Sequence, residues 1–246
     1  DRDPRRIEPV IAHLQSRHYK NPLNQPLTWY WEGGRRYVDA LYTGPPALAM
    51  LYHATRDKKY LEWMEAFVWD VYGALYDEED SLFYRDKRMI RGYPGSIRSR
   101  DRKPGHIDRS EMRRSFVYQE SPQGRKVFWS RGNGWAFAGL ARVLKYLPAD
   151  HASYPRYLSV YRQMAHTLIS RQGPEGFWRM NLDDPDDFKQ PETSGTGFFV
   201  YGLAMGLNEG WISVEDFEAA VFKGWMALAG SVDAEGRVQW GQPVGY

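Results

Sequence analysis

The sequence predicts an all-α fold built from repeated helical hairpins. Three segments share one layout: a short motif precedes a helix rich in small residues, a longer amphipathic helix and a short extended piece. The first helix of each segment is apolar nearly all round, whereas the second carries charge on one face. Buried inner helices with outer helices facing water form either a closed α/α toroid or an open α-solenoid.

The first repeat follows a helical pattern within residues 5–18 and a segment at 19–36 that is typical of a loop. The pairs Asn21-Pro22 and Gly33-Gly34 mark this segment, because such residues favour turns over helices. The first repeat then comprises a motif, two helices and an extended piece, at residues 37–42, 48–52, 59–76 and 82–85.

The second and third repeats have the same four parts. Small residues such as Gly139 and Gly202 let the inner helices approach each other closely. Each motif precedes an inner helix, so in a toroid the motifs meet at one end around a central pocket, and their residues are the better functional candidates. The parts lie at 129–135, 137–147, 154–171 and 176–179 in the second repeat, and at 192–197, 198–207, 214–232 and 236–240 in the third.

We expect residues 1–246 to form a single domain with one insertion, at 87–126. The insertion is dense in arginine, glycine and proline and has poor apolar periodicity, which is typical of a long surface loop. It is either a solvated excursion or a source of positive field that attracts a polyanionic substrate. The chain begins at Asp1 rather than at methionine, which predicts a processed or partial chain.

Composition argues against several classes of protein. The net charge of +2 gives no support to nucleic-acid binding, and the absence of cysteine excludes disulfides and thiolate metal sites. The six histidines lack the spacing of metal ligands, and no apolar run approaches the roughly 20 residues of a membrane span. Ten tryptophans and 17 tyrosines suit either sugar binding or aromatic packing between helices.

The motif at 129–135 combines two indoles and a guanidinium with a predicted Gly-Asn-Gly turn before a helix. Trp129, Arg131 and Trp135 offer a planar cation and flat aromatic faces, which suit a ring-shaped anionic ligand such as a uronic acid. A capped core helix with a buried tryptophan pair explains the same residues. The residues alone do not separate these interpretations.

This motif resembles glycoside hydrolase family 105, the unsaturated rhamnogalacturonyl and related unsaturated uronyl hydrolases. Three further blocks agree in order, at 39–46, 82–86 and 192–204, so that the resemblance covers nearly the whole chain outside 87–126. It implies an (α/α)6 toroid, of which this chain is an incomplete part that lacks family segments at both ends. It also implies a bacterial protein, of the cytoplasm or the periplasm.

The family's substrates carry a terminal 4,5-unsaturated uronic acid, which polysaccharide lyases create. The resemblance implies hydration of the C4=C5 double bond, in which a proton goes to C4, water adds at C5, and the resulting hemiketal opens and releases the glycosidic bond. One carboxyl group serves as acid and then base if burial or a second carboxylate raises its pKa. No metal or organic cofactor is implied, and the family's second active-site aspartate belongs to a segment before Asp1.

Asp39 matches the family's general acid/base, and its structural alternative is a helix N-cap. The resemblance implies that Arg131 binds the substrate carboxylate or ring oxygens and that the substrate stacks on Trp135. Trp129 and Asn133 are expected to position the loop. Thr193 and Ser194 are expected either to line the pocket with Glu192 or to cap a helix. The other residues expected around the substrate are Arg85, where relatives often have histidine, and Tyr84, Glu192, Trp31 and Trp178.

The predicted function is a cofactor-independent glycosidase that removes the unsaturated uronic acid from pectin or rhamnogalacturonan oligosaccharides, with Asp39 as general acid/base. The expected partner is an unsaturated uronyl oligosaccharide, and neither nucleic acid nor a membrane. Two alternatives stay open: a catalytically inactive glycan-binding toroid, and an α-solenoid scaffold for protein interactions.

Overall fold

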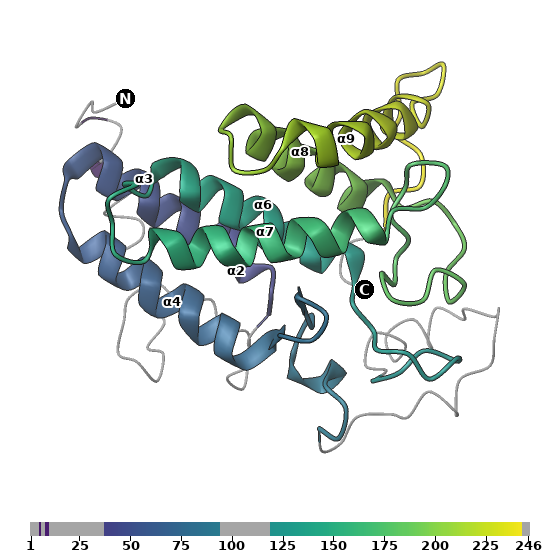
Figure 1. The fold of residues 1–246 in the computed structure, drawn as a ribbon, viewed down its shortest axis with the longest axis horizontal. Coiled ribbons are helices and arrows are strands. Elements are labelled where there is room, and N and C mark those ends of the chain that lie inside the picture. The colour runs from purple at the N-terminus through teal and green to yellow at the C-terminus, as the bar shows by residue number, and fades with distance from the viewer. Residues whose placement is uncertain (1–4, 6–7, 10–36, 94–118, 243–246) are drawn as a thin grey trace.

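The computed structural model describes residues 37–93 and 119–242, together with the isolated residues 5, 8 and 9 (Figure 1). The predicted helix within 5–18 and the predicted loop at 19–36 therefore lie almost wholly outside the described residues. The described part is mostly helical and contains one two-stranded sheet. None of its helices combines the length and the hydropathy of a bilayer-spanning segment.

The first repeat forms the short helix α2 (Ala40–Thr43), then α3 (Pro45–Thr55) and α4 (Lys59–Leu75). Proline is tolerated at the start of α3, where the missing N–H has no helical partner, and Arg56 ends the helix in a left-handed conformation with φ of 63°. Apolar side chains recur along α4 at intervals of three and four and face the core, as an amphipathic outer helix requires.

The predicted extended piece after α4 is a strand of a β-hairpin. Strand β1 (Tyr76–Asp77) pairs antiparallel with β2 (Leu82–Phe83), so that Tyr76 lies opposite Phe83. The 3-10 helix η1 (Lys87–Met89) follows. The hairpin therefore carries the chain from the outer helix back to residue 85.

The second repeat forms α6 (Ser130–Tyr146) and α7 (Tyr154–Ser170), and here the predicted Gly-Asn-Gly turn is wrong. Gly132, Asn133 and Gly134 lie in the first turns of α6. The two glycines allow close packing and do not form a turn. A Cβ on Gly132 would lie 2.7 Å from the Trp129 ring, and one on Gly134 would lie 2.8 Å from the Phe198 side chain.

The third repeat forms α8 (Thr193–Asn208) and α9 (Val214–Ala229). The sequence placed the start of α8 at residue 198, but the helix begins at Thr193 because Glu192 caps it through the amides of Ser194 and Gly195. Similarly, α9 ends at Ala229, earlier than the predicted end at 232.

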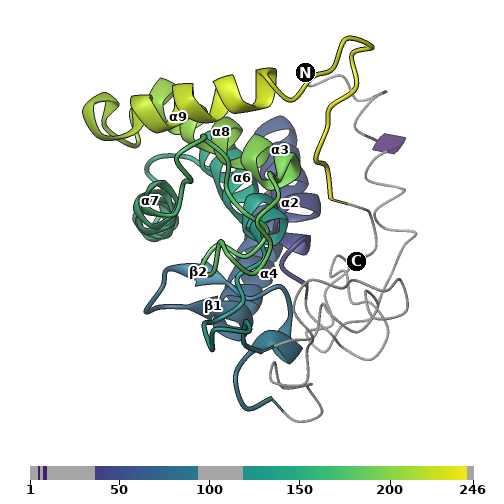
Figure 2. The same cartoon turned by 90° about the vertical axis from the view of Figure 1, so that its right-hand side faces the viewer.

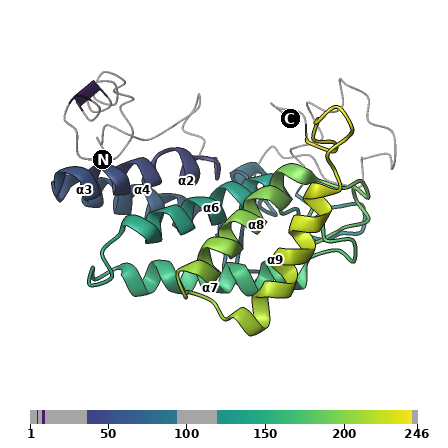
Figure 3. The same ribbon diagram turned by 90° about the horizontal axis from the view of Figure 1, so that it is seen from above.

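The helices are arranged as the repeat predicts, with α6 between α3 and α8 and an outer helix beside each inner one (Figures 1 and 3). Glycines allow this spacing. A Cβ on Gly202 would lie 2.6 Å from the Phe137 ring, and one on Gly139 would collide with the Leu41 carbonyl. The close approach of α6 to α8 and to α2 therefore depends on glycines at the contact points.

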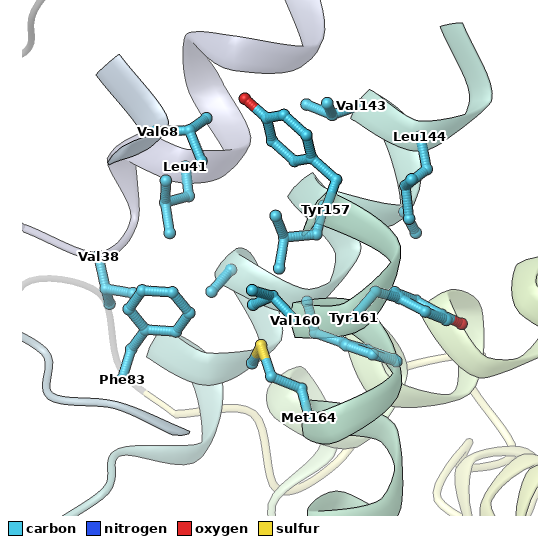
Figure 4. Close-up of a cluster of buried hydrophobic side chains, with 14 of the residues drawn as sticks. Val38, Leu41, Val68, Phe83, Val143, Leu144, Tyr157, Val160, Tyr161 and Met164 are labelled. Carbon is cyan, nitrogen blue, oxygen red and sulfur yellow. The ribbon is translucent and has the colours of Figure 1, made fainter. Parts of the chain in front are cut away.

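A buried apolar cluster joins the first repeat to the second (Figure 4). Leu41 and Val68 meet Val160 there, from α2, α4 and α7. On α7, Tyr161 stacks on Phe137 with ring centroids 4.7 Å apart, and its hydroxyl donates to the Gly202 carbonyl at 2.7 Å. An outer helix is therefore tied to both neighbouring inner helices.

The predicted insertion at 87–126 is described only at its two ends. Gln119 joins them, since its Oε1 accepts from the Gly92 amide and its Nε2 donates to the Tyr93 carbonyl, both at 3.0 Å. Arg91 pairs with Glu120 at 2.9 Å. Residues 94–118 lie outside the described part, so the inserted loop and the single domain stay predictions.

Candidate active site

The starts of α2, α6 and α8 lie together at one end of the inner helices, as the repeat predicts. A Cβ on Gly132 would lie 3.0 Å from the Val38 side chain, and one on Gly195 would lie 3.0 Å from the Arg131 amide nitrogen. Three of the predicted site residues, Asp39, Arg131 and Glu192, stand at these helix starts.

Asp39 occupies the N-cap position of α2, but its side chain makes no capping hydrogen bond. The N-cap alternative for this residue is therefore wrong. Burial raises the pKa of Asp39 above its ordinary value, while its own backbone amide and the charges of Arg85 and Arg131 oppose the rise and Asp86 adds to it. A carboxyl group with a raised pKa suits a general acid.

Arg131 is buried in the first turn of α6 and lies over the Trp129 ring, 4.8 Å from its centroid. Burial lowers its pKa, and the carboxylates of Glu192 and Asp39 oppose this. An arginine stays charged in proteins even so. The site thus presents a guanidinium flanked by two carboxyl groups and backed by an indole.

Glu192 is buried, and both of its carboxylate oxygens cap α8. Oε1 accepts from the Ser194 amide at 2.8 Å and from the Ser194 hydroxyl, and Oε2 accepts from the Gly195 amide at 2.6 Å. Glu192 is therefore the cap that the sequence assigned to Thr193 or Ser194. Its charge reaches Arg131, but its oxygens are already committed to the helix.

The sequence analysis missed Gln242, which binds two motif residues. Its Oε1 accepts from Trp129 Nε1 at 2.7 Å, and its carbonyl accepts from an Arg131 terminal nitrogen at 2.9 Å. Thr193 holds the same segment through the carbonyls of Gln239, at 2.9 Å, and Trp240 (yellow in Figure 2). No local pattern signals a contact between residues more than 100 positions apart.

Asn133 is fully buried and ties α6 to β2. Its Oδ1 accepts from the Phe83 amide at 2.8 Å, and its Nδ2 donates to the carbonyls of Phe83 and Trp129 at 2.9 and 3.1 Å. These bonds fix the strand two residues before Arg85. They match the expected positioning role and leave the amide no free group for substrate.

Trp135 is partly exposed and belongs to an aromatic group on the inner helices. Its ring centroid lies 4.2 Å from that of Phe198 and 4.9 Å from that of Tyr42. The Arg142 guanidinium lies 5.0 Å above the Tyr42 ring. The stacking role expected of Trp135 stays a prediction.

Three other predicted contacts have different outcomes. Tyr84 is buried, and its hydroxyl donates to Asp77 at 2.9 Å, while its expected contact with the substrate stays a prediction. Trp178 was placed at the rim, which is wrong: it is fully buried and donates to the Leu168 carbonyl at 2.7 Å. Trp31 lies outside the described residues.

Asp77, Glu79 and Asp80 bring carboxylate oxygens within 4.8 Å of one another on the β-hairpin. The Lys126 ammonium contacts all three, at 2.9, 2.7 and 2.7 Å respectively, and Arg171 adds a contact to Asp80 at 2.7 Å. These two cations offset much of the negative charge of the three carboxylates. We call Asp77, Glu79, Asp80 and Lys126 the hairpin cluster.

A family model described as Glycosyl Hydrolase Family 88 matches residues 106–245. The chain belongs to this family. Two curated relatives, both named unsaturated 3S-rhamnoglycuronyl hydrolase, support the assignment. The one from Alteromonas sp. (strain LOR) is 35% identical over 90% of this chain and 46% of the relative, and the one from Formosa agariphila is 33% identical over 92% and 53%. This family 88 chain thus spans about half the length of the curated relatives it matches.

Solved structures agree with the fold. A glycosyl hydrolase family 88 protein from Bacteroides vulgatus is 34% identical, with a TM-score of 0.72 over 85% of this chain and 53% of that one. A possible member of the GH105 family from Salmonella enterica matches at 18% identity, with a TM-score of 0.72 over 98% and 58%. The predicted resemblance and the incomplete (α/α)6 toroid are confirmed, and the α-solenoid alternative is set aside.

Proposed function

We propose that this chain carries the general acid/base of a glycosidase that removes a terminal 4,5-unsaturated uronic acid from lyase-generated oligosaccharides. The observation that supports this most is the Asp39 carboxyl group, which burial holds at a raised pKa although two guanidinium groups lie near it. Ordinary glycosidases flank the anomeric carbon with two carboxyl groups. Here a carboxyl group whose pKa burial raises lies near cations, which suits protonation of an anionic, unsaturated ring.

In the first step, the Asp39 carboxylic acid gives its proton to C4. The electron pair of the C4=C5 bond forms the new C–H bond, and the positive charge that develops at C5 is shared with the ring oxygen. Asp39 becomes a carboxylate in this step, and the Arg85 and Arg131 charges stabilise it.

In the second step, water adds at C5 and its proton passes to the Asp39 carboxylate, which restores the acid. The resulting hemiketal opens to a ketone at C5, and the hemiacetal left at C1 releases the aglycone with its hydroxyl group. One water is consumed for each glycosidic bond, and nothing is oxidised or reduced. The step needs no cofactor.

The substrate carboxylate is assigned to Arg131 or Arg85, because guanidinium groups bind carboxylates through paired N–H donors. Trp135, which is partly exposed beside Phe198 and Tyr42, is the proposed surface for the C–H face of the sugar. Asn133, Trp129 and Glu192 support these residues through the bonds described above.

The names of the two curated relatives support an unsaturated 3S-rhamnoglycuronyl end as the substrate, in place of the pectin type expected from the sequence. The comparison of lyase-treated ulvan with lyase-treated rhamnogalacturonan decides between them. We expect the ulvan oligosaccharides to react faster.

The test follows the ultraviolet absorbance of these oligosaccharides with the full chain and with Asp39→Asn. Hydration destroys the conjugated double bond, so the wild type should remove the signal and the variant should not. Constant absorbance with both glycans, together with measurable binding by calorimetry, would instead establish the inactive glycan-binding alternative.

A further inference from the structure

Asp86 is the most tightly bound carboxylate near Asp39. It is only 1% exposed, and two nitrogens of the Arg85 guanidinium contact its Oδ2, Nε at 3.0 Å and a terminal nitrogen at 2.8 Å. Arg88 binds it from the other side, with Nε at 2.8 Å from Oδ1 and a terminal nitrogen at 2.9 Å from Oδ2. Both guanidinium groups therefore share one buried anion.

This anion is not the acid of the reaction. Burial alone would raise the pKa of Asp86, but the Arg88 hydrogen bonds and the charges of Arg85 and Arg88 hold it below its ordinary value. Asp86 is thus ionised throughout the neutral range, and its charge acts on its neighbours.

The backbone places this group beside Asp39. The Val38 amide donates to the Arg85 carbonyl at 3.0 Å, and an Arg88 terminal nitrogen donates to the Tyr37 hydroxyl at 3.2 Å. The residues on the N-terminal side of Asp39 are therefore held by residues 85–88. Arg85 and Asp86 lie close enough for both charges to act on the Asp39 carboxyl.

The charges around Asp39 create a conflict. Arg85 and Arg131 both favour its ionised form, whereas an acid that protonates carbon must arrive with its proton in place. Burial opposes ionisation of Asp39 most strongly, and among the charged groups with the largest effect on it, Asp86 opposes ionisation whereas Arg85 and Arg131 favour it.

We propose that Asp86 is a positioning residue of this site, which holds the Arg85 guanidinium beside Asp39 and offsets its positive charge, and thereby favours the protonated form of Asp39. The inference rests on the proposed function for its catalytic consequence, but not for the electrostatic coupling itself. Asp86 itself takes no part in the proposed chemical steps.

Three variants of the full chain separate this role from a structural ion pair. Asp86→Asn keeps an oxygen that accepts from Arg85 but removes the negative charge. Arg85→Gln removes the positive charge, and Arg88→Gln is the matched control, because Arg88 binds the same carboxylate but its charge is not among the largest influences on Asp39. Thermal unfolding shows which variants are folded.

The primary readout is the titration of the Asp39 carboxyl carbon by ¹³C NMR, with the signal assigned by its loss in Asp39→Asn. Loss of the Asp86 charge should move the Asp39 midpoint to lower pH, loss of the Arg85 charge should move it to higher pH, and Arg88→Gln should leave it in place. The high-pH limb of kcat/KM should move with the midpoint, and each pH unit changes the protonated fraction about tenfold.

An unchanged or raised midpoint in Asp86→Asn overturns the proposal. Should that variant not fold, Arg85→Gln carries the test, and an unchanged or lowered midpoint there overturns it equally. A wild type that binds but never turns over the unsaturated oligosaccharides refutes the proposed function alone, because the NMR titration reads the coupling without any reaction.

Discussion

The candidate site and the hairpin cluster both combine carboxyl groups with cationic side chains, but the pKa of the carboxyl group is shifted in opposite directions in the two regions. In the hairpin cluster, three carboxylates surround the Lys126 ammonium at 2.7–2.9 Å, and the pKa of Asp77 is lowered although its burial opposes this. At the site, Asp39 makes no ion pair among the described residues, and burial raises its pKa. Direct pairing fixes a carboxylate as an ion, whereas a buried carboxyl group that has cations nearby but forms no ion pair with them keeps a raised pKa and can exchange a proton.

The largest difference between the two regions should appear when one carboxyl group is removed from each. Asp39→Asn removes the proposed acid and base, so turnover should fall about 10²–10⁴-fold, the usual contribution of general acid–base catalysis. Asp80→Asn in the hairpin cluster should keep turnover and lower stability by about 1 kcal/mol. Initial rates and denaturant unfolding on both variants measure this. A loss of turnover in Asp80→Asn comparable to that in Asp39→Asn would erase the distinction.

A second test concerns the strand that joins the two regions. Asn133→Ala leaves the buried amide and carbonyl of Phe83 without their partner, which should cost about 3 kcal/mol of unfolding free energy. It should also raise KM, because Phe83 lies two residues before Arg85, which is proposed to bind the substrate. Gln172→Ala is the control, since Gln172 likewise donates to two backbone carbonyls, those of Gly176 and Ala220, but contacts none of the motif residues through them. Equal effects of the two variants on KM would contradict the positioning role of Asn133.

These residues show what the sequence could and could not provide. The hairpin repeat follows from local periodicity, which is why α4 and α7 were predicted nearly to both ends, whereas only the C-terminal end of α6 was. Gly132 and Gly134 misled because glycine signals a turn locally, whereas here it serves contacts with Trp129 and Phe198.

The site was predicted only in part for a related reason. Asp39 and Arg131 belong to motifs that can be recognised in one dimension. The fold alone brings Asp86 near Asp39 and Gln242 near Arg131, and Tyr84 and Trp178 carry aromatic side chains whose burial no local pattern reveals. Residue type suggests chemistry, but packing decides which groups remain available for it.

A third test removes the ammonium group of the hairpin cluster. Lys126→Met leaves three carboxylates within contact of one another, and should cost about 2 kcal/mol of stability at neutral pH. The lowered pKa of Asp77 means that its folded-state advantage is present above the ordinary aspartate pKa and disappears as the pH falls through the lowered value. The difference in stability between wild type and variant should therefore shrink in acid. Chemical denaturation at several pH values measures it, and a difference that grows in acid would contradict the account.

The smallest expected effect belongs to the contact between the motif and the C-terminal segment. Trp129→Phe keeps an aromatic ring under Arg131 but removes the hydrogen bond from Nε1 to Gln242, which should cost about 1 kcal/mol. Gln242→Ala removes the same bond from the other side but retains the backbone carbonyl that Arg131 binds. A double-mutant cycle on unfolding free energy isolates the shared bond. If the two losses simply add, then the bond contributes nothing, and the segment at 239–242 is held by its other bonds, which include those to Thr193 and Arg131. If they do not add, then Trp129 couples the segment to the helix start that carries Arg131, and substrate affinity should weaken in both single variants.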